Sequence, residues 1–277
     1  DLSEANDLSL DKFFGGMVEL ATMRSSWNDT NALFTGMRGG DANVNHGHMD
    51  LGSFTLDANG VGWAVDPGGD DYNLPGYFDS LDNRWKFYRL KGESHNLLTI
   101  NPDETPEMDP LSRAEMKLHS KAKGAYVEID LAKAYAKKGV QSYHRAMGLI
   151  ENRSRFLVQD EVQMDHPSEI YWFMHTNAPE INLSADGKTA VLEQNGQRLH
   201  ARILSPAQAE FTVRPDAPLP KTPKVPNQTF FPDMKKLTIH LEGVEQETIS
   251  VCLTPLKPGE AEPEEFPKVQ PIADWEI

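Results

Sequence analysis

The segment from Asn45 to Asp66, NHGHMDLGSFTLDANGVGWAVD, concentrates residues that could do chemistry. His46 and His48 are separated by one glycine, and in an extended chain this spacing places both imidazoles on the same face, roughly 6.5 to 7 Å apart. Such a pair can chelate a metal ion, and Asp66 and His95 would complete a donor set that zinc accepts, with one position left for water. The alternative is that these histidines only form hydrogen bonds within strands. Spacing alone leaves both interpretations open.

Basic residues flank the same segment. The run RWKFYRLK from Arg84 to Lys91 carries four cations with interleaved aromatic residues, on a chain whose formal net charge is −15. Guanidinium groups bind planar carboxylates and sulfate-like anions through paired hydrogen bonds, so the cluster predicts an anionic ligand. A solvated basic edge is the competing interpretation. The candidate binding residues are Arg24, Arg38, Arg84 and Arg89.

A loop rich in Gly, Asp and aromatic residues follows the segment, from Pro67 to Asp82, and it is long enough to be functional. Tyr72 and Tyr77 could pass protons there, although a loop tyrosine more often packs as a lid. Asp50 could orient a metal-bound imidazole or cap a turn. The other six histidines are predicted to have ordinary surface or core roles.

Several classes of function are disfavoured. The acidic net charge argues against nucleic-acid binding, and no apolar run approaches the roughly 18 residues of a membrane span. The chain has no GxSxG elbow, P-loop or Rossmann fingerprint. No charged-then-apolar leader follows Asp1, which is compatible with a missing signal peptide or larger N-terminal portion, so this end does not indicate the location. The single cysteine, Cys252, lies in an alternating run and is predicted to be a small buried apolar group.

The elements that must position these residues are predominantly strands. A strand pair is predicted at 17–24 and 32–38, with Gly39-Gly40 ending the second strand, followed by a hairpin with its turn at Asn59-Gly60 and a strand at 95–101. Residues 1–16 predict a helical or loop entry. One short helix is expected at 131–138, ended by Gly139.

From Ser112 onward, apolar residues alternate with polar ones, as at 156–164, 237–241 and 249–253. Two proline-rich segments interrupt this pattern: 215–233 predicts an extended surface excursion, and 255–271 predicts a terminal strap or a partly ordered tail. Many short strands at regular spacing predict an all-β protein, a large antiparallel β-sandwich or a barrel.

Several ordered motifs in about the first 110 residues resemble the heparinase II/III-like family of polysaccharide lyases. They are MRSSW at 23–27, ALFTGMRGGD at 32–41, NHGHMDLGSFTLDANGVGWAVDPG at 45–68, DYNLPGYF at 71–78, RWKFYR at 84–89 and ESHNLLTINP at 93–102. The resemblance implies a β-sandwich of two stacked sheets over residues 1–277: a motif region at 1–110, further strands at 111–254 and a C-terminal strap at 255–277. In the family an N-terminal (α/α) toroid, absent from this chain, forms the other wall of the cleft.

The resemblance also implies roles for residues. His46 matches the catalytic histidine, and His48, Asp66 and His95 match the ligands of a structural zinc ion whose fourth ligand would be water. Tyr77, with Tyr72 as second choice, falls near a tyrosine that lines the cleft. The implied reaction is β-elimination on a uronic-acid-containing polysaccharide, either heparin/heparan sulfate-like or alginate-like, by a periplasmic or secreted enzyme. Because relatives draw further catalytic residues from the toroid, this chain alone is expected to be poorly active or inactive.

Two rival functions are also consistent with these residues. The first is a zinc-dependent hydrolase that uses a metal-bound water. The second is a noncatalytic carbohydrate-binding sandwich with a structural zinc ion.

Overall fold

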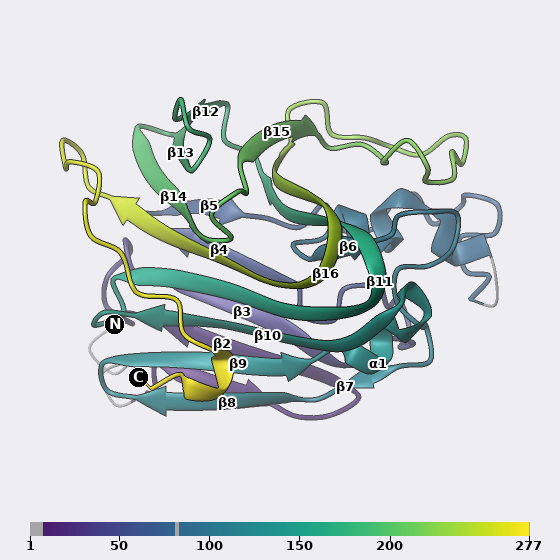
Figure 1. The fold of residues 1–277 in the computed structure, drawn as a ribbon, viewed down its shortest axis with the longest axis horizontal. Coiled ribbons are helices and arrows are strands. Elements are labelled where there is room, and N and C mark those ends of the chain that lie inside the picture. The colour runs from purple at the N-terminus through teal and green to yellow at the C-terminus, as the bar shows by residue number, and fades with distance from the viewer. Residues whose placement is uncertain (1–7, 81–82, 277) are drawn as a thin grey trace.

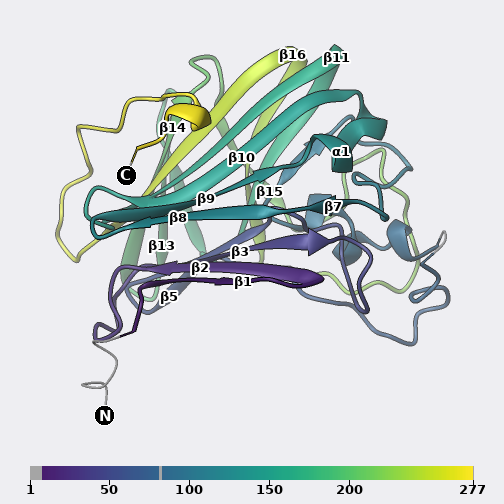
Figure 2. The same cartoon turned by 90° about the horizontal axis from the view of Figure 1, so that it is seen from below.

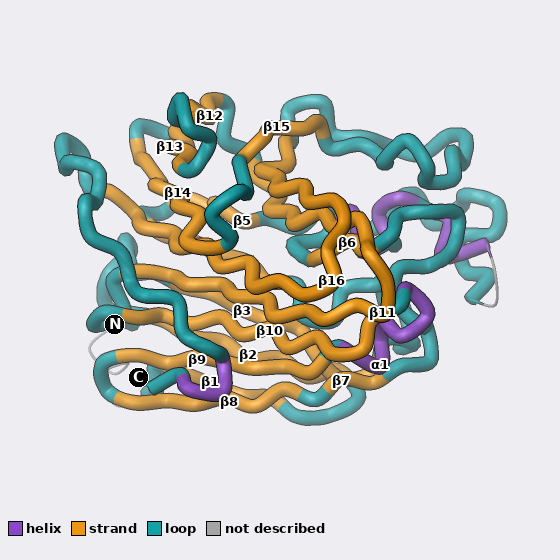
Figure 3. Tube along the Cα trace, viewed as in Figure 1, coloured by secondary structure: helices purple, strands orange, loops and turns teal. Residues whose placement is uncertain are grey.

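The computed structural model describes residues 8–80 and 83–276, and most of its regular structure is strand (Figures 1 and 3). Two antiparallel sheets stack face to face, as Figure 2 shows with the first sheet below the second. This architecture confirms the predicted all-β sandwich.

The first sheet has six strands, and five of them follow one another in sequence order. These are β1 (Asp11–Phe14), β2 (Val18–Arg24), β3 (Phe34–Asp41), β4 (Phe54–Ala58) and β5 (Val61–Ala64), with β7 (Arg113–Ala114) paired to β3. The turn at Asn59-Gly60 joins β4 to β5, as predicted. Alternate residues of β2 point into the sandwich: Ala21 and Met23 are buried, whereas Val18 and Leu20 are exposed.

The second sheet has ten strands in the order β12-β13-β14-β16-β11-β10-β9-β8, with β15 paired to β16 and β6 paired to β11. Their bounds are β6 (Leu98–Ile100), β8 (Met116–Lys121), β9 (Gly124–Asp130), β10 (Val140–Ile150), β11 (Arg155–Thr176), β12 (Glu180–Leu183), β13 (Thr189–Gln194), β14 (Gln197–Ser205), β15 (Phe211–Pro215) and β16 (Lys235–Leu256). The rings of Phe54 and Phe156 lie 5.2 Å apart between the two sheets. Apolar contacts of this kind fill the core and supply the main driving force for folding.

A fully buried ion pair joins two neighbouring strands of the second sheet. Arg145 of β10 bonds Asp160 of β11, with Nε 2.6 Å from Oδ1 and Nη2 2.9 Å from Oδ2. Its Nη1 donates to the carbonyl oxygens of Gly52 and Asn96, at 2.9 and 2.7 Å. Because every partner is satisfied, the buried charges are tolerated, and they tie the segments around β4 and His95 to the second sheet.

Helical structure is short. The predicted helix is present as α1 (Ala132–Tyr135) and the 3-10 turn η5 (Ala136–Lys138), and Gly139, with φ +84°, ends it. The basic run forms the 3-10 turns η2 (Asn83–Lys86) and η3 (Tyr88–Leu90), followed by η4 (Gly92–Ser94), and η6 (Ile272–Asp274) lies near the C-terminus. Within the described residues, no helix has the length and apolar character needed to cross a membrane.

Several boundary predictions are wrong. The strand β3 runs through Gly39-Gly40 to Asp41, because Gly40 takes φ +86° and approaches the Met17 carbonyl so closely that a Cβ would lie 2.3 Å from it. Residues 11–14 form a strand, while residues 1–7 lie outside the described residues. The runs at 237–241 and 249–253 belong to one 22-residue strand, β16.

The proline-rich excursion runs over the surface beside η2–η4, as Figure 1 shows at the upper right. The Glu93 carboxylate accepts hydrogen bonds from the Leu219 amide and the Thr222 hydroxyl, at 3.1 and 2.9 Å. The Asp70 carboxylate accepts one from the Thr229 amide at 3.0 Å. The excursion therefore holds in place the loop that carries the candidate tyrosines.

The C-terminal segment crosses the outer face of the second sheet, seen in yellow in Figure 1. The Gln159 side chain donates to the Gln270 carbonyl at 2.7 Å, and the Ile272 amide donates to Glu161 at 2.7 Å. The segment thus lies as the strap that its composition predicts.

Candidate functional site

The structure brings together the three predicted metal ligands. Asp66 directly follows β5, and its Oδ2 lies 2.6 Å from Nδ1 of His95, which is fully buried after η4. The His48 ring centroid lies 5.3 Å from that of His95. Asn96 fixes this meeting point, because its side-chain amide donates to the carbonyls of Phe54 and Val65 at 2.7 and 3.0 Å.

Charge and burial determine the titration of these groups. Burial, and then the neighbouring His95, lower the pKa of His48 to about 3 against the opposing effect of Asp66. Burial alone would raise the pKa of Asp66, but His95, the Gly68 amide and His48 together lower that pKa. Burial alone would lower the pKa of His95, but Asp66 and Asp50 together raise it.

The three residues are of the types that zinc binds, but their ligand atoms do not all lie within 4.8 Å of one another. Two imidazoles and one carboxylate are a common zinc donor set, and Nε2 of His95 is buried without a hydrogen-bond partner, a position that a ligand would relieve. Asp66 keeps 35% of its side chain exposed, so the group is open on one side.

Asp50 serves neither of its two predicted roles through a hydrogen bond in the described residues. Its Oδ1 lies 2.9 Å from Nη1 of Arg38, whose Nη2 donates to the Asp41 carbonyl at 2.7 Å. Burial raises the pKa of the Asp50 carboxyl against the effect of Arg38. The pair links β3 to the loop of the two histidines.

His46 and His48 lie outside any strand and their rings contact different partners, so the expected extended strand at this position is wrong. His46 lies in a turn before β4 with φ +60°, and its side chain is exposed. Gly47 permits the turn, because a Cβ there would lie 2.6 Å from the Ala42 carbonyl oxygen. The imidazole of His46 stacks on Tyr72, with ring centroids 5.4 Å apart and an interplanar angle of 25°.

The two candidate tyrosines differ in access. Tyr77 is only 2% exposed, its hydroxyl accepts a hydrogen bond from the Asp70 amide at 2.8 Å, and burial raises its pKa. Tyr72 is 53% exposed and lies between His46 and Tyr77, 5.5 Å from the latter. The geometry therefore places Tyr72 ahead of Tyr77 as the residue that a ligand could touch.

Two of the four candidate arginines form structural contacts beside the site. Arg84 is buried and donates to the carbonyls of Tyr77 and Gly47, at 2.7 and 2.8 Å. Arg89 is buried and donates to the Gly69 carbonyl at 2.7 Å, with Nε and Nη2 left without hydrogen-bond partners. Together they attach the aromatic loop to η2 and η3.

Arg24 lies apart from this group. It pairs with Phe34, four residues along β3 from Arg38, which corresponds to roughly 13 Å of strand. Its guanidinium stacks on Trp27, 3.5 Å from the ring centroid. The structure thus brings Arg38, Arg84 and Arg89 to the candidate site but not Arg24.

Another donor set lies on the second sheet. Glu169, His240 and Glu242 bring their ligand atoms within 4.8 Å of one another, the one such set among the residues that the structure describes. The sequence signal for this group is Glu242, two residues after His240 on the same strand. Glu169 is already engaged, because it contacts Lys221 at 3.2 Å and the Tyr171 hydroxyl at 2.8 Å.

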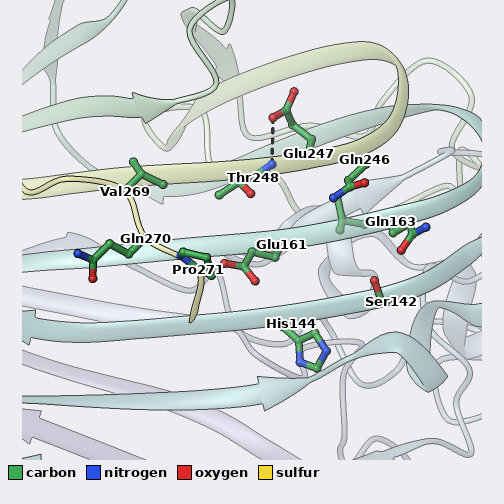
Figure 4. Close-up of a pocket in the computed structure, with 11 residues that line it drawn as sticks. Ser142, His144, Glu161, Gln163, Gln246, Glu247, Thr248, Val269, Gln270 and Pro271 are labelled. Carbon is green, nitrogen blue, oxygen red and sulfur yellow. Dashed lines mark hydrogen bonds between the residues drawn. The ribbon is translucent and has the colours of Figure 1, made fainter. Parts of the chain in front are cut away.

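A groove lies elsewhere, on the outer face of the second sheet beside the strap (Figure 4). It has a volume of 360 Å³ and is lined by polar side chains of β10, β11 and β16. Figure 4 shows Ser142 and His144 below Glu161 and Gln163. None of the predicted site residues lines it.

Comparisons with known proteins agree with the fold. The family model described as "Heparinase II/III-like, C-terminal" matches residues 15–251. Heparan sulfate lyase HepC from Pedobacter heparinus superposes with a TM-score of 0.70 at 15% identity, over 91% of this chain and 37% of that one. A heparinase III gene product gives a TM-score of 0.69 at 15% identity, over 90% and 36%. At such identities the likeness establishes the fold alone, and the chain spans little more than a third of these structures. No curated protein sequence matches the chain.

Proposed function

The chain belongs to the heparinase II/III-like family, as its C-terminal part, and from this premise we propose that it is the β-sandwich portion of a polysaccharide lyase. The proposed reaction is β-elimination on uronic-acid-containing anionic polysaccharides of the heparan sulfate or alginate kind. One observation carries the proposal: an exposed histidine, His46, is fixed against an exposed tyrosine, Tyr72, next to a zinc-type donor set.

The chemistry requires a base, a proton donor and charge neutralisation. The proton on C5 of a uronate is weakly acidic, and its removal builds negative charge on the adjacent carboxylate. His46 is proposed to act as acid/base or to neutralise that carboxylate, while the leaving C4 oxygen takes a proton. Tyr72 is proposed as its partner in proton transfer, because its ring is exposed beside His46 whereas Tyr77 is buried.

His48, Asp66 and His95 are proposed to hold a structural zinc ion. When bound, the ion would crosslink the histidine loop, the end of β5 and the segment after η4. The buried and unpartnered Nε2 of His95 supports this assignment. By holding His48 in place, these residues would fix the direction of the His46 side chain, which lies two residues earlier in the chain.

The complete enzyme is proposed to include an N-terminal (α/α) toroid that closes the other side of the cleft. The short coverage of the solved structures supports this, since the chain matches 36–37% of their length. The proposed location of the whole protein is the periplasm or the extracellular space, where such polysaccharides are met.

The test is product formation by the complete protein. With heparan sulfate or alginate, the lyase should generate the ultraviolet absorbance of an unsaturated uronate, and His46→Ala should abolish it while the protein remains folded. His144→Ala, an exposed histidine on the second sheet, is the matched control and should keep full activity.

The rival functions give different results. A zinc hydrolase would release new chain ends without the absorbance and would lose activity on chelation. A noncatalytic binding module would retain saccharide binding in His46→Ala and form no product. Either result, obtained with wild-type protein, would refute the lyase.

A further inference from the structure

Two large aromatic side chains beside His46 are exposed to solvent. Tyr72 is 53% exposed and Phe78 is 49% exposed. Burying such rings is favourable, so a contiguous exposed group of them on a folded protein marks a binding surface more often than an accident of packing. The sequence singled out Tyr72, whereas Phe78 becomes visible only in the structure.

The rings form a right-angled corner. Tyr72 and His46 stack with an interplanar angle of 25°, whereas Phe78 stands edge-on to both. Its centroid lies 5.5 Å from His46 at 88° and 5.1 Å from Tyr72 at 85°. We call His46, Tyr72 and Phe78 the aromatic corner.

The corner is supported from beneath, so it is preorganised. The buried ring of Tyr77 lies 5.3 Å from Phe78 and 5.2 Å from Phe87, both edge-on. The Arg84 guanidinium carbon lies 5.5 Å from the Phe78 ring, and its two backbone hydrogen bonds hold the loops of His46 and Tyr77. A ligand that enters a rigid corner loses little binding energy to ordering of the protein.

A sugar ring has the complementary chemistry. A pyranose presents one face of C–H groups, which packs on an aromatic ring, and a rim of hydroxyls and carboxylates, which needs polar partners. Ligand sites combine these two kinds of contact in the same way. The corner offers the ring face of Phe78 together with the imidazole of His46 and the phenol of Tyr72.

We propose that Phe78 is a specificity-determining residue whose exposed ring packs against the C–H face of the sugar placed over His46. The inference rests on the proposed function, because it takes a saccharide as the ligand. It adds that the affinity for the sugar depends on packing against the Phe78 ring. The positively charged side chains do not make this contact.

The test compares Phe78→Ala, Phe78→Trp and Phe14→Ala in the complete protein. Phe14 is a matched control, since it is an aromatic residue 55% exposed on β1, outside the site. With heparan sulfate and alginate oligosaccharides as probes, Phe78→Ala should raise Kd and KM at least tenfold and change kcat much less. Phe78→Trp should restore binding, and Phe14→Ala should leave it unchanged. Thermal unfolding of each variant verifies the fold.

Unchanged Kd and KM in a folded Phe78→Ala protein would overturn this inference while leaving the lyase proposal intact. A fall in kcat at constant KM would also overturn it, because Phe78 would then only position His46. If wild-type protein neither binds nor cleaves the probes, the proposed function itself fails. Weakened binding in Phe14→Ala as well would refute a localised aromatic wall.

Discussion

The backbone conformation of His46 directs two nearby histidines, His46 and His48, to different partners. With φ +60° at His46, the chain turns, so that this imidazole reaches Tyr72 while His48 lies against His95. A non-glycine residue in this region is strained by about 1–3 kcal/mol and persists only where its surroundings enforce it. Here the Gly47 amide donates to the Val44 carbonyl at 2.8 Å, and Arg84 binds the Gly47 carbonyl. The strain is therefore held by contacts on both sides of the turn.

At this scale, the zinc assignment can be tested by metal content. We expect about one zinc ion per chain in the purified protein, and loss of that zinc with a lower melting temperature in His48→Ala, because ligand removal uncouples the three segments. Measurement is by elemental analysis and thermal unfolding with and without a chelator.

The variant His240→Ala is the matched control, since His240 belongs to the other donor set with Glu169 and Glu242. It should retain the zinc. Loss of zinc in His240→Ala and retention in His48→Ala would assign the metal to the second sheet instead.

The residue types of the site could be predicted from the sequence, but their directions could not. The HxH spacing indicated chemistry, but that spacing argument assumes a strand. The turn at His46 depends on Arg84, which reaches the Gly47 carbonyl only in the folded chain. The burial of a side chain could not be predicted from the sequence either. Tyr72 and Tyr77 are alike in sequence, and only packing against Phe87 distinguishes the buried one.

At the scale of the elements, close approach of backbones explains β3. The strand β3 continues through Gly40, where the sequence predicted its end. The backbone at the start of β2 lies so close to Gly40 that a side chain would have no room. Alternation located most strands correctly, since one face of each is buried. It failed at β16, where a glycine and polar residues in the middle of one long strand imitated a loop.

We expect Gly40→Ala to destabilise the protein by about 3 kcal/mol, because a Cβ would combine a left-handed φ of +86° with a 2.3 Å contact to the Met17 carbonyl oxygen. Gly60→Ala is the control: it has φ +70° but nothing within 4 Å, so about 1 kcal/mol is expected. Denaturant unfolding measures both, and equal losses would show that the close contact relaxes.

At the scale of the whole molecule, an acidic chain exposes an apolar edge strand. The chain carries a formal net charge of −15, but β1, the edge strand of the first sheet, and β2 expose Phe14, Val18 and Leu20. An exposed apolar edge strand favours association with another surface.

We therefore expect this chain, produced by itself, to self-associate with increasing concentration, and Phe14→Lys to reduce the association without loss of stability. Sedimentation velocity measures it. Val269→Lys, which adds the same charge at an exposed position of the strap, should have little effect. Equal effects of the two variants would point to net charge as the cause instead of the β1 edge.

The two 22-residue strands have a consequence for the order of events during synthesis. β11 (Arg155–Thr176) pairs with β16 (Lys235–Leu256) along most of its length, yet residues 177–234 separate them in the chain. The ribosome must therefore deliver all of β16 before the centre of the second sheet can close. Until then one long edge of β11 stays unpaired, and pairing between such distant segments is slow. The hairpin that ends at Asp66 is synthesised far earlier. Its attachment to the second sheet requires Arg145, which binds the carbonyls of Gly52 and Asn96.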